Sequence, residues 1–245
     1  MKRFACILVL AISANFVLCQ NNTTNMRRNS KKETPRYLYS ERELNKVSDY
    51  IELQYGKYDE VFHELVSPDV HLDVVIVPPT EEQPYYKLVT MGAGAYKMDI
   101  PREFRKWKLE RAEYVIFLPE DWDIKSDKEE DYWPIRMLKD VARLPIDTDS
   151  WLSVGHTVTM NEDSSPVASN TLFNSCVLFH SFGKNKQVVE ALKIGLFGDE
   201  VNFWQVFPLY QEELEYKFKH PVDDLIELLK DVPMVVDIHR KNFCK

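Results

Sequence analysis

Glycine is scarce in this chain of 245 residues, which contains seven glycines and thirteen prolines. These counts argue against a low-complexity protein. The few glycines also fail to form a phosphate-binding loop, because Gly92 and Gly94 lack the third glycine and the following helix that a dinucleotide site requires. We interpret these two glycines as a turn or bulge in the backbone.

Recognisable catalytic and metal-binding motifs are also missing. Ser153 is followed by Val154 and Gly155, but the glycine that precedes the serine of a nucleophile elbow is absent. No histidines have zincin spacing, and the acidic stretch over residues 121–131 lacks the glycine turn of a calcium loop. The sequence therefore predicts no cofactor and no metal site.

Positive charge is in deficit, since 31 Lys and Arg residues face 39 Asp and Glu residues, for a net charge of −8. We expect no nucleic-acid partner, because phosphate neutralisation needs clustered basic side chains. An acidic surface favours a basic protein or peptide partner, through steering more than through tight affinity.

Apolar residues, by contrast, are plentiful: 44% of the chain is hydrophobic and 12% is aromatic. This composition can bury a sizeable core, and the length suits one domain or two small ones. Because no internal repeat occurs and no linker follows residue 40, we predict a single domain over residues 40–245.

The first 19 residues have the pattern of a secretory signal peptide. Lys2 and Arg3 precede an apolar run over residues 4–18, which is shorter than the ~20 residues of a membrane span. Cleavage after Cys19 leaves a mature chain without a stable membrane span, so we expect a secreted or exported protein. The alternatives are a membrane anchor formed by the uncleaved segment and lipidation at Cys19.

A polar, basic segment over residues 20–39 is interpreted as a flexible tether. It opens with two overlapping N-glycosylation signals, at Asn21 and Asn22. These signals matter only if the export machinery is eukaryotic.

The densest apolar pattern lies between Leu72 and Met98. A β-branched run over residues 72–77 ends at two prolines, and a second run over residues 85–91 ends at Gly92, so both are predicted buried strands. Further strands are predicted over residues 114–118, 151–158, 176–179, 201–209 and 234–238.

Helices are predicted around these strands. Ser40 and Glu43 have capping-box spacing and Gly56 follows the apolar face, so a first helix is expected between them. Other helices are predicted over residues 61–65, after an Asp131 cap, and over residues 210–218 and 225–232. This irregular order predicts an α+β fold, a mixed α/β sandwich whose central mixed sheet is flanked by helices.

Two histidine-containing groups are candidates for chemistry. His63, Asp69, His71 and Asp73 are ligand types for zinc or iron, but their predicted elements differ. His156 follows a glycine and suits a general base, yet no nucleophile is paired with it, and a structural role is favoured. The alternative function is a metal-dependent or hydrolytic enzyme that uses His156 with Asp73 or His71.

The mature chain keeps two cysteines, Cys176 and Cys244. In an oxidising compartment they would form a disulfide that closes a long loop. Two free thiols are the equally weighted alternative.

The chain resembles the Suppressor of fused domain family, especially its compact single-domain members. The most specific matches are HLDVVIVPPTEEQPYYKLVTMGAGAYKM and VNFWQVFPLYQEELEYK. In family order, the matching segments are residues 71–98, 111–124, 133–145, 151–158, 201–217 and 223–232. The predicted signal peptide and tether depart from the family members, which are mostly intracellular.

This resemblance implies a non-enzymatic protein-binding module with an α/β sandwich fold. The animal member clasps a short peptide as an added strand with the help of a second domain, which this chain lacks. Microbial relatives have been proposed as toxin-neutralising immunity proteins, so the expected role is regulatory or toxin-neutralising. The resemblance implies that the partner-binding residues are Gly155, His156, Thr157, Trp204, Gln205, Phe207 and Pro208.

Overall fold

The computed structural model describes residues 36–67, 69–195 and 198–245. The predicted signal peptide, its processing at Cys19 and the sequons at Asn21 and Asn22 therefore lie outside the described residues.

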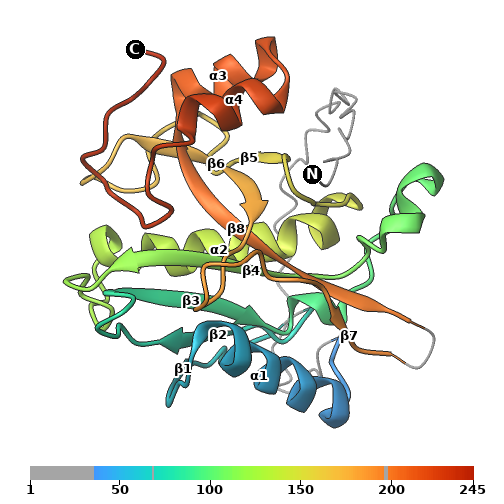
Figure 1. Ribbon diagram of the computed structural model, residues 1–245. Coiled ribbons are helices and arrows are strands. Elements are labelled where there is room, and N and C mark those ends of the chain that lie inside the picture. Colours follow the sequence, from blue (N-terminus) through green and yellow to red (C-terminus); the bar gives the residue numbers. More distant parts are fainter. Residues whose placement is uncertain (1–35, 68, 196–197) are drawn as a thin grey trace, which may run out of the picture.

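A mixed sheet of eight strands forms the centre of the protein, in the order β1-β2-β3-β4-β8-β6-β5, with β7 pairing with β8 (Figure 1). The strands are β1 (Glu60–Phe62), β2 (Asp73–Val77), β3 (Tyr85–Met91), β4 (Ala112–Pro119), β5 (Thr157–Thr159), β6 (Phe173–His180), β7 (Leu192–Lys193) and β8 (Glu200–Tyr210). The helices are α1 (Glu41–Tyr55), α2 (Glu129–Thr148), α3 (Gln211–Lys219) and α4 (Val222–Leu229), with two short 3₁₀ helices, Ala93–Ala95 and Arg102–Trp107.

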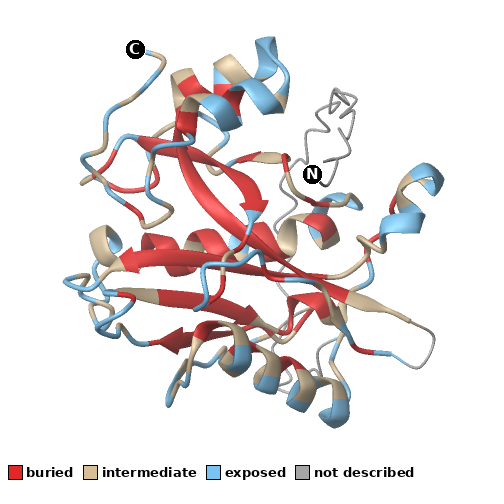
Figure 2. Cartoon of the chain, viewed as in Figure 1, coloured by how far each residue is buried: buried red, intermediate tan, exposed pale blue. Residues whose placement is uncertain are grey.

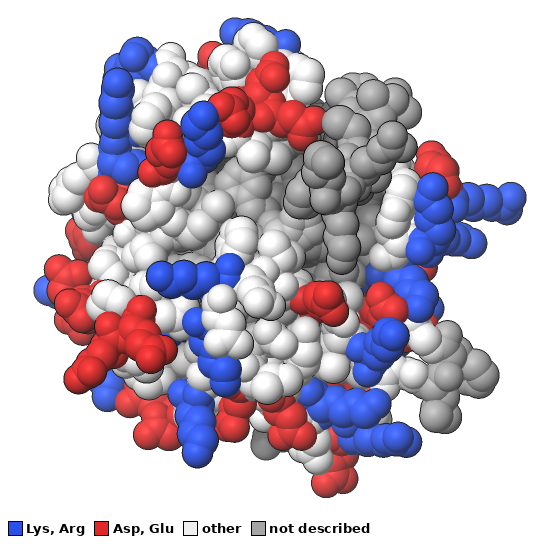
Figure 3. All heavy atoms as spheres, viewed as in Figure 1, with Lys and Arg blue, Asp and Glu red and all other residues white. Residues whose placement is uncertain are grey.

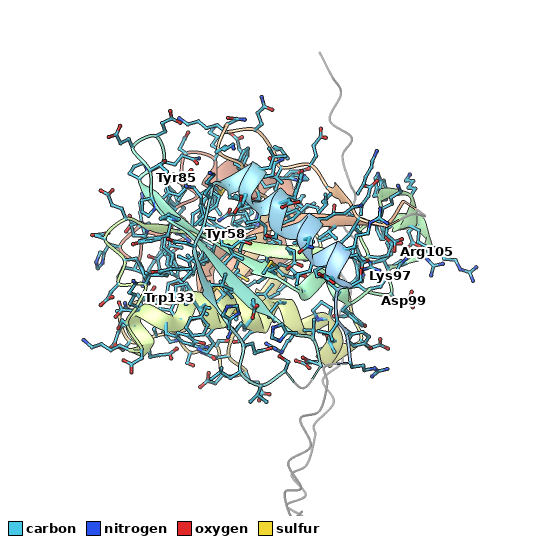
Figure 4. All side chains as sticks on the ribbon, turned by 90° about the horizontal axis from the view of Figure 1, so that it is seen from below. Tyr58, Tyr85, Lys97, Asp99, Arg105 and Trp133 are labelled. Atoms are coloured by element: carbon cyan, nitrogen blue, oxygen red, sulfur yellow. The ribbon has the colours of Figure 1, made fainter. Side chains whose placement is uncertain are left out.

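Helices cover both faces of this sheet. The long helix α2 packs on one face, where Trp133, Leu138 and Val141 join the largest apolar cluster. Helix α1 covers the opposite face over β2, β3 and β4, and α4 covers that face over β6 and β8. Figure 4 shows the sheet edge-on, with Trp133 on the α2 side and Tyr85 on the α1 side. Figure 2 shows the central strands buried almost throughout.

The predicted α+β architecture with one mixed sheet is confirmed. Each half of the sheet is antiparallel, and the two halves meet at the parallel pair β4 and β8, which joins Ala112 to Asn202 and Val115 to Gln205. Among the described residues, no helix has the length and apolar character needed to cross a membrane.

Helix α1 begins and ends where its sequence predicts. The Ser40 hydroxyl accepts a hydrogen bond from the Glu43 amide, and the Glu43 carboxylate accepts one from the Ser40 amide. Gly56 ends the helix with a positive φ of 123°, a backbone conformation that favours glycine. Residues 36–39, placed in the tether by the sequence, contact the folded domain, since the Tyr37 amide donates to the Asp69 carbonyl.

Four predicted elements differ from the structure. The predicted helix over residues 61–65 is absent: Val61 and Phe62 belong to strand β1, where Val61 pairs with Val75 at the sheet edge, and residues 63–65 follow the strand as loop. Strand β5 occupies only Thr157–Thr159, because the chain turns before it at Gly155, where φ is 83°. Helix α2 begins at Glu129, before the expected Asp131 cap. The predicted closing strand over residues 234–238 is reduced to one isolated bridge.

Pro134 in α2 leaves one backbone carbonyl of the first turns without its usual helical hydrogen bond. Pro134 has no N–H to donate to the carbonyl of Glu130. That carbonyl instead accepts a 2.9 Å hydrogen bond from the side-chain amide of Asn170. Three acidic residues in the first turn, Glu129 to Asp131, complement the positive end of the helix dipole.

The glycine turn after β3 is organised by a buried carboxylate, Glu113. Its two oxygens accept hydrogen bonds from the backbone amides of residues 92–94 and from the hydroxyls of Thr90 and Tyr39. Burial raises the pKa of Glu113, and these hydrogen bonds lower it in part. Gly94 is required here because a Cβ would lie 2.2 Å from the Tyr39 hydroxyl.

Candidate functional site

The sheet divides beyond Val115 and Gln205. Strands β4 and β8 pair only up to these residues, although β4 continues to Pro119 and β8 continues to Tyr210. Beyond this point β8 turns away from β4 and continues to pair with β6. We call the space between residues 116–119 of β4 and residues 206–210 of β8 the fork. Along this space the backbone edges of β4 and β8 no longer pair with each other.

The chain fills the fork with its own residues 233–243, here called the C-terminal segment. Val235 forms a parallel bridge with Phe117, and the Val236 amide donates a 2.8 Å hydrogen bond to the Phe117 carbonyl. In Figure 1 this red segment descends from α4 toward the place where β8 and β4 separate, and then turns back. An extended segment therefore fits beside β4.

Pro208 shows how β8 is adapted to the fork. A proline in a central strand has no N–H to donate to a carbonyl of the neighbouring strand. The Pro208 carbonyl accepts a 2.9 Å hydrogen bond from the guanidinium of Arg240, so its peptide groups face the C-terminal segment rather than β6. The missing N–H consequently costs no ladder hydrogen bond.

A buried ion pair holds the C-terminal segment at the far end of the fork. The two terminal nitrogens of Arg240 donate to the two carboxylate oxygens of Glu213 at 2.6 and 2.5 Å. The Glu213 side chain is 0% exposed and the Arg240 side chain is 6% exposed. The guanidinium also lies 4.6 to 5.2 Å from the ring centres of Phe173, Tyr210 and Phe207. The site thus matches an arginine in charge, shape and ring contacts.

A cavity of about 430 Å³ opens beside this ion pair. Its walls include Leu172, Asn174, Tyr210 and Glu212. The buried Asn174 carbonyl oxygen has no hydrogen-bond partner, while its amide nitrogen is fixed by Ser164 and Gln211. The fork therefore ends in a hollow, and one residue of its lining, Asn174, keeps a buried acceptor without a partner.

The structure brings the sequence-predicted binding residues to the two sides of β6. The Gly155 amide donates to the Leu178 carbonyl, the Leu178 amide donates to the His156 carbonyl, and Thr157 pairs with Val177. On the other side of β6, its residues 176–180 pair with residues 204–208 of β8. The two predicted segments are therefore two strands apart in one sheet.

Most of these side chains are buried and do not form a surface. Trp204 and Phe207 are 4% and 3% exposed, Gln205 is 0% exposed, and Pro208 is also buried. Trp204 packs in the α2-side core, whereas Phe207 packs under α4. The predicted contact surface at Trp204 to Pro208 needs this correction: a partner could reach the backbone of this strand at the fork, but not these side chains. The family resemblance implied these residues, whereas the burial of their side chains follows from the packing of β8 on both faces.

His156 is packed against another aromatic side chain. Its ring lies edge-on to the ring of Trp151, with 4.5 Å between ring centres. Burial lowers its pKa, a hydrogen bond to the Trp151 backbone raises it in part, and Lys217 lowers it further.

His63, His71 and Asp73 do come together. The two carboxylate oxygens of Asp73 lie 3.0 Å from His63 Nδ1 and 3.3 Å from His71 Nε2. Ser67 bridges His71 and Glu64, and Arg143 pairs with Glu64 and Asp69. This network ties the loop before β2 to helix α2. Within the described ranges, no three His, Cys, Asp or Glu side chains are placed to hold a metal ion.

The residues of the alternative enzyme are far apart. Asp73 and His71 lie at β2, and His156 lies at β5, with β3, β4, β8 and β6 between them. Five strand spacings of ~4.8 Å amount to roughly 20 Å or more. The geometry does not assemble His156 with Asp73 or His71.

The two cysteines of the predicted disulfide are free thiols, as in the alternative expectation. Cys176 is buried in β6, where burial raises its pKa to about 12, and Cys244 is half-buried in the C-terminal part of the chain.

Charge on the surface is mixed. On the face seen in Figure 3, acidic and basic side chains surround a largely uncharged centre. The acidic net charge is therefore not gathered into one patch among the described residues of that face.

Sequence reasoning missed the residues that shape the fork, namely Phe117, Glu213, Val235 and Arg240. One usable signal was Pro208 inside an 11-residue strand, because proline in a long strand marks an edge or an irregularity.

A model of the family described as Suppressor of fused protein (SUFU) matches residues 68–241 of this chain. The comparison with curated proteins gave no match.

Three solved structures are similar in fold. A putative suppressor of fused homologue from Neisseria gonorrhoeae shares 18% identity over 81% of this chain and 95% of its own, with a TM-score of 0.57. A chain of the Sufu–Fu complex shares 12% identity over 86% of this chain and 93% of its own, with a TM-score of 0.59. Drosophila Suppressor of fused shares 11% identity over 82% of this chain and 50% of its own, with a TM-score of 0.51.

Proposed function

This chain belongs to the Suppressor of fused protein family, and on that premise we propose that it is a non-enzymatic module that binds a protein partner. The observation that carries the proposal is the fork. An extended segment already lies along β4 there, which is the geometry of partner binding by strand addition. The similar fold in the Sufu–Fu complex supports a protein as the partner.

Strand addition suits the fork for a physical reason. Other edges of the sheet are short, since β1 and β5 have three residues each. Short edges offer few hydrogen bonds to an incoming chain. At the fork, β4 and β8 run four to five residues beyond their common pairing, and a segment between them contacts two strands at once.

The test is capture of a partner by the tagged full chain under native conditions, followed by lysine cross-linking and mass spectrometry. The partner should cross-link to Lys241 and Lys245, which are exposed at the end of the fork. Lys97, exposed at the opposite end of β4 and β8 where it pairs with Asp199, serves as the internal control. Cross-links at Lys97 without any at Lys241 or Lys245 would place the interface elsewhere and refute the fork.

The regulatory and toxin-neutralising roles both use such binding, and the captured partner separates them. A toxin arrests growth when it is expressed without this chain, and co-expression restores growth. A regulated protein changes its activity on binding but is harmless alone.

We also propose that the chain is exported, because residues 1–19 have the charge and apolar pattern of a signal peptide. N-terminal sequencing of the mature protein should begin at Gln20. A mature protein that begins at Met1 would contradict cleavage.

A further inference from the structure

We propose that the fork selects a partner segment similar to the chain's own residues 235–240, and that the C-terminal segment competes with that partner. The preferred segment has a β-branched residue beside Phe117 and, five positions later, an arginine that reaches Glu213. This inference rests on the proposed function and names the chemistry of its partner.

The arginine requirement follows from the surroundings of Glu213. This carboxylate is 0% exposed, and both of its oxygens are bonded to the guanidinium of Arg240. Three aromatic rings face the same guanidinium. A planar donor pair that also stacks on rings is specific to arginine, and lysine cannot reproduce it.

The residue at the strand position is selected by packing. Val235 bridges Phe117 in parallel register, and both residues belong to the apolar cluster on the α1 side. Val236, the next residue, is 5% exposed and packs in the α2-side cluster. A pair of β-branched residues therefore fills both faces of the sheet at this point.

The C-terminal segment is held more firmly at its arginine than along its strand. Its ladder contact with β4 is one isolated bridge, whereas β3 pairs with β4 over five residues. At Arg240 it gains the Glu213 pair, the Pro208 carbonyl and the hydrogen bond from the Tyr210 hydroxyl to the Arg240 carbonyl. A competing segment must therefore supply the arginine, and displacement of Arg240 opens the fork.

The probe is a fluorescent peptide of residues 231–242, DVPMVVDIHRKN, added to the full chain. The Arg240→Met chain leaves Glu213 free and should bind this peptide at least tenfold more tightly than the unmodified chain. Replacing the arginine in the peptide by lysine should lower affinity at least tenfold. The matched control is Arg105→Met, because Arg105 pairs with Asp99 at an exposed site away from the fork (Figure 4). This control should bind no better than the unmodified chain.

A folded Arg240→Met chain that ignores the peptide, or that binds the arginine and lysine peptides equally, overturns the inference. If Arg240→Met does not fold, hydrogen exchange on the unmodified chain decides. The Val236 amide should then exchange at least 100-fold faster than the Val89 amide of β3, through local opening. Equal rates would show that the segment leaves only on global unfolding, and would overturn it.

The two proposals fail in different ways. A partner that cross-links at Lys241 and Lys245 while the peptide fails to bind refutes only the sequence requirement. A peptide that binds while every captured partner cross-links elsewhere refutes the fork as the functional interface.

Discussion

The hydroxyl of Tyr39 donates a 2.8 Å hydrogen bond to the carboxylate of Glu113, 74 residues further along the chain. It connects the residues before α1 to the centre of the sheet. The same carboxylate holds the glycine turn after β3, so the start of the domain and its most specific sequence motif share one anchor.

Removing that hydroxyl should be costly. Tyr39→Phe leaves a buried carboxylate with one donor fewer and should destabilise the protein by about 1–3 kcal/mol. Denaturant unfolding measures the change. Tyr58→Phe is the control, because Tyr58 bonds the neutral hydroxyl of Ser48, and its cost should be about 1 kcal/mol or less. A larger loss at Tyr58 would contradict this account of Glu113.

Gly94→Ala should destabilise the protein, and Tyr39→Phe should relieve part of that loss. The added Cβ would lie 2.2 Å from the Tyr39 hydroxyl oxygen and 3.1 Å from a methyl group of Val201. Overpacking of this kind costs about 1–3 kcal/mol. A double-mutant cycle by denaturant unfolding measures the coupling, and strictly additive losses would place the clash elsewhere.

The Arg240–Glu213 pair should behave as a buried pair whose members depend on each other. Arg240→Met leaves the Glu213 charge uncompensated and should cost about 3–5 kcal/mol. The double variant with Glu213→Gln should lose less than the sum of the single losses. Thermal or denaturant unfolding of the three variants gives the coupling, and a coupling near zero would mean that solvent reaches the pair.

Acid should weaken the fold partly through His156. Burial lowers its pKa in the folded state, so the unfolded chain binds the proton more readily. Above the ordinary histidine pKa of about 6.5, His156 is neutral in both states and its contribution to stability is complete. As the pH falls below that value, the unfolded chain takes up the proton first and the contribution is lost. His156→Gln should therefore show a shallower loss of stability between pH 7 and pH 5 in denaturant titrations. Identical slopes would contradict the lowered pKa.

Lys87 should destabilise the protein at neutral pH. Its amine is buried in β3, has no hydrogen-bond partner and lies 4.9 Å from the centre of the Tyr85 ring. Burial lowers its pKa to about 8, so the unfolded chain binds the proton more tightly, and stability rises with pH from about 8 to about 10. Lys87→Met should stabilise the protein at pH 7 by up to about 3 kcal/mol, with the gain shrinking toward pH 10. A destabilised variant would show that the amine has a partner in solution.

Local patterns in the sequence predicted most of the sheet and the main helices. The β-branched run at Asp73–Val77, the second run at Tyr85–Met91 and the capping box at Ser40 each act over a few residues. Such short-range patterns can be interpreted without knowing the rest of the fold. The family resemblance extended the prediction from these single elements to the whole domain.

The fork could not be predicted in this way, because it depends on distant segments. The sequence does not show that β4 and β8 separate after Val115. A full strand was therefore expected at Val235 and its neighbours, where the structure has one bridge inside the fork. Similarly, nothing near Glu213 in the chain indicates an arginine 27 residues later as its partner. The family resemblance implied a binding surface at Trp204, and a strand buried on both faces has no polar side that would have indicated that its side chains are covered.

The parallel pairing of β4 with β8 also predicts an order of folding. Residues 60–119 contain one antiparallel ladder and residues 157–210 contain another, and each can form from neighbouring strands. Joining Ala112 to Asn202 requires closure of a much longer loop, which is slow because its entropy is lost before its contacts are gained. The two halves should therefore form first, and their junction should be the slow step of folding.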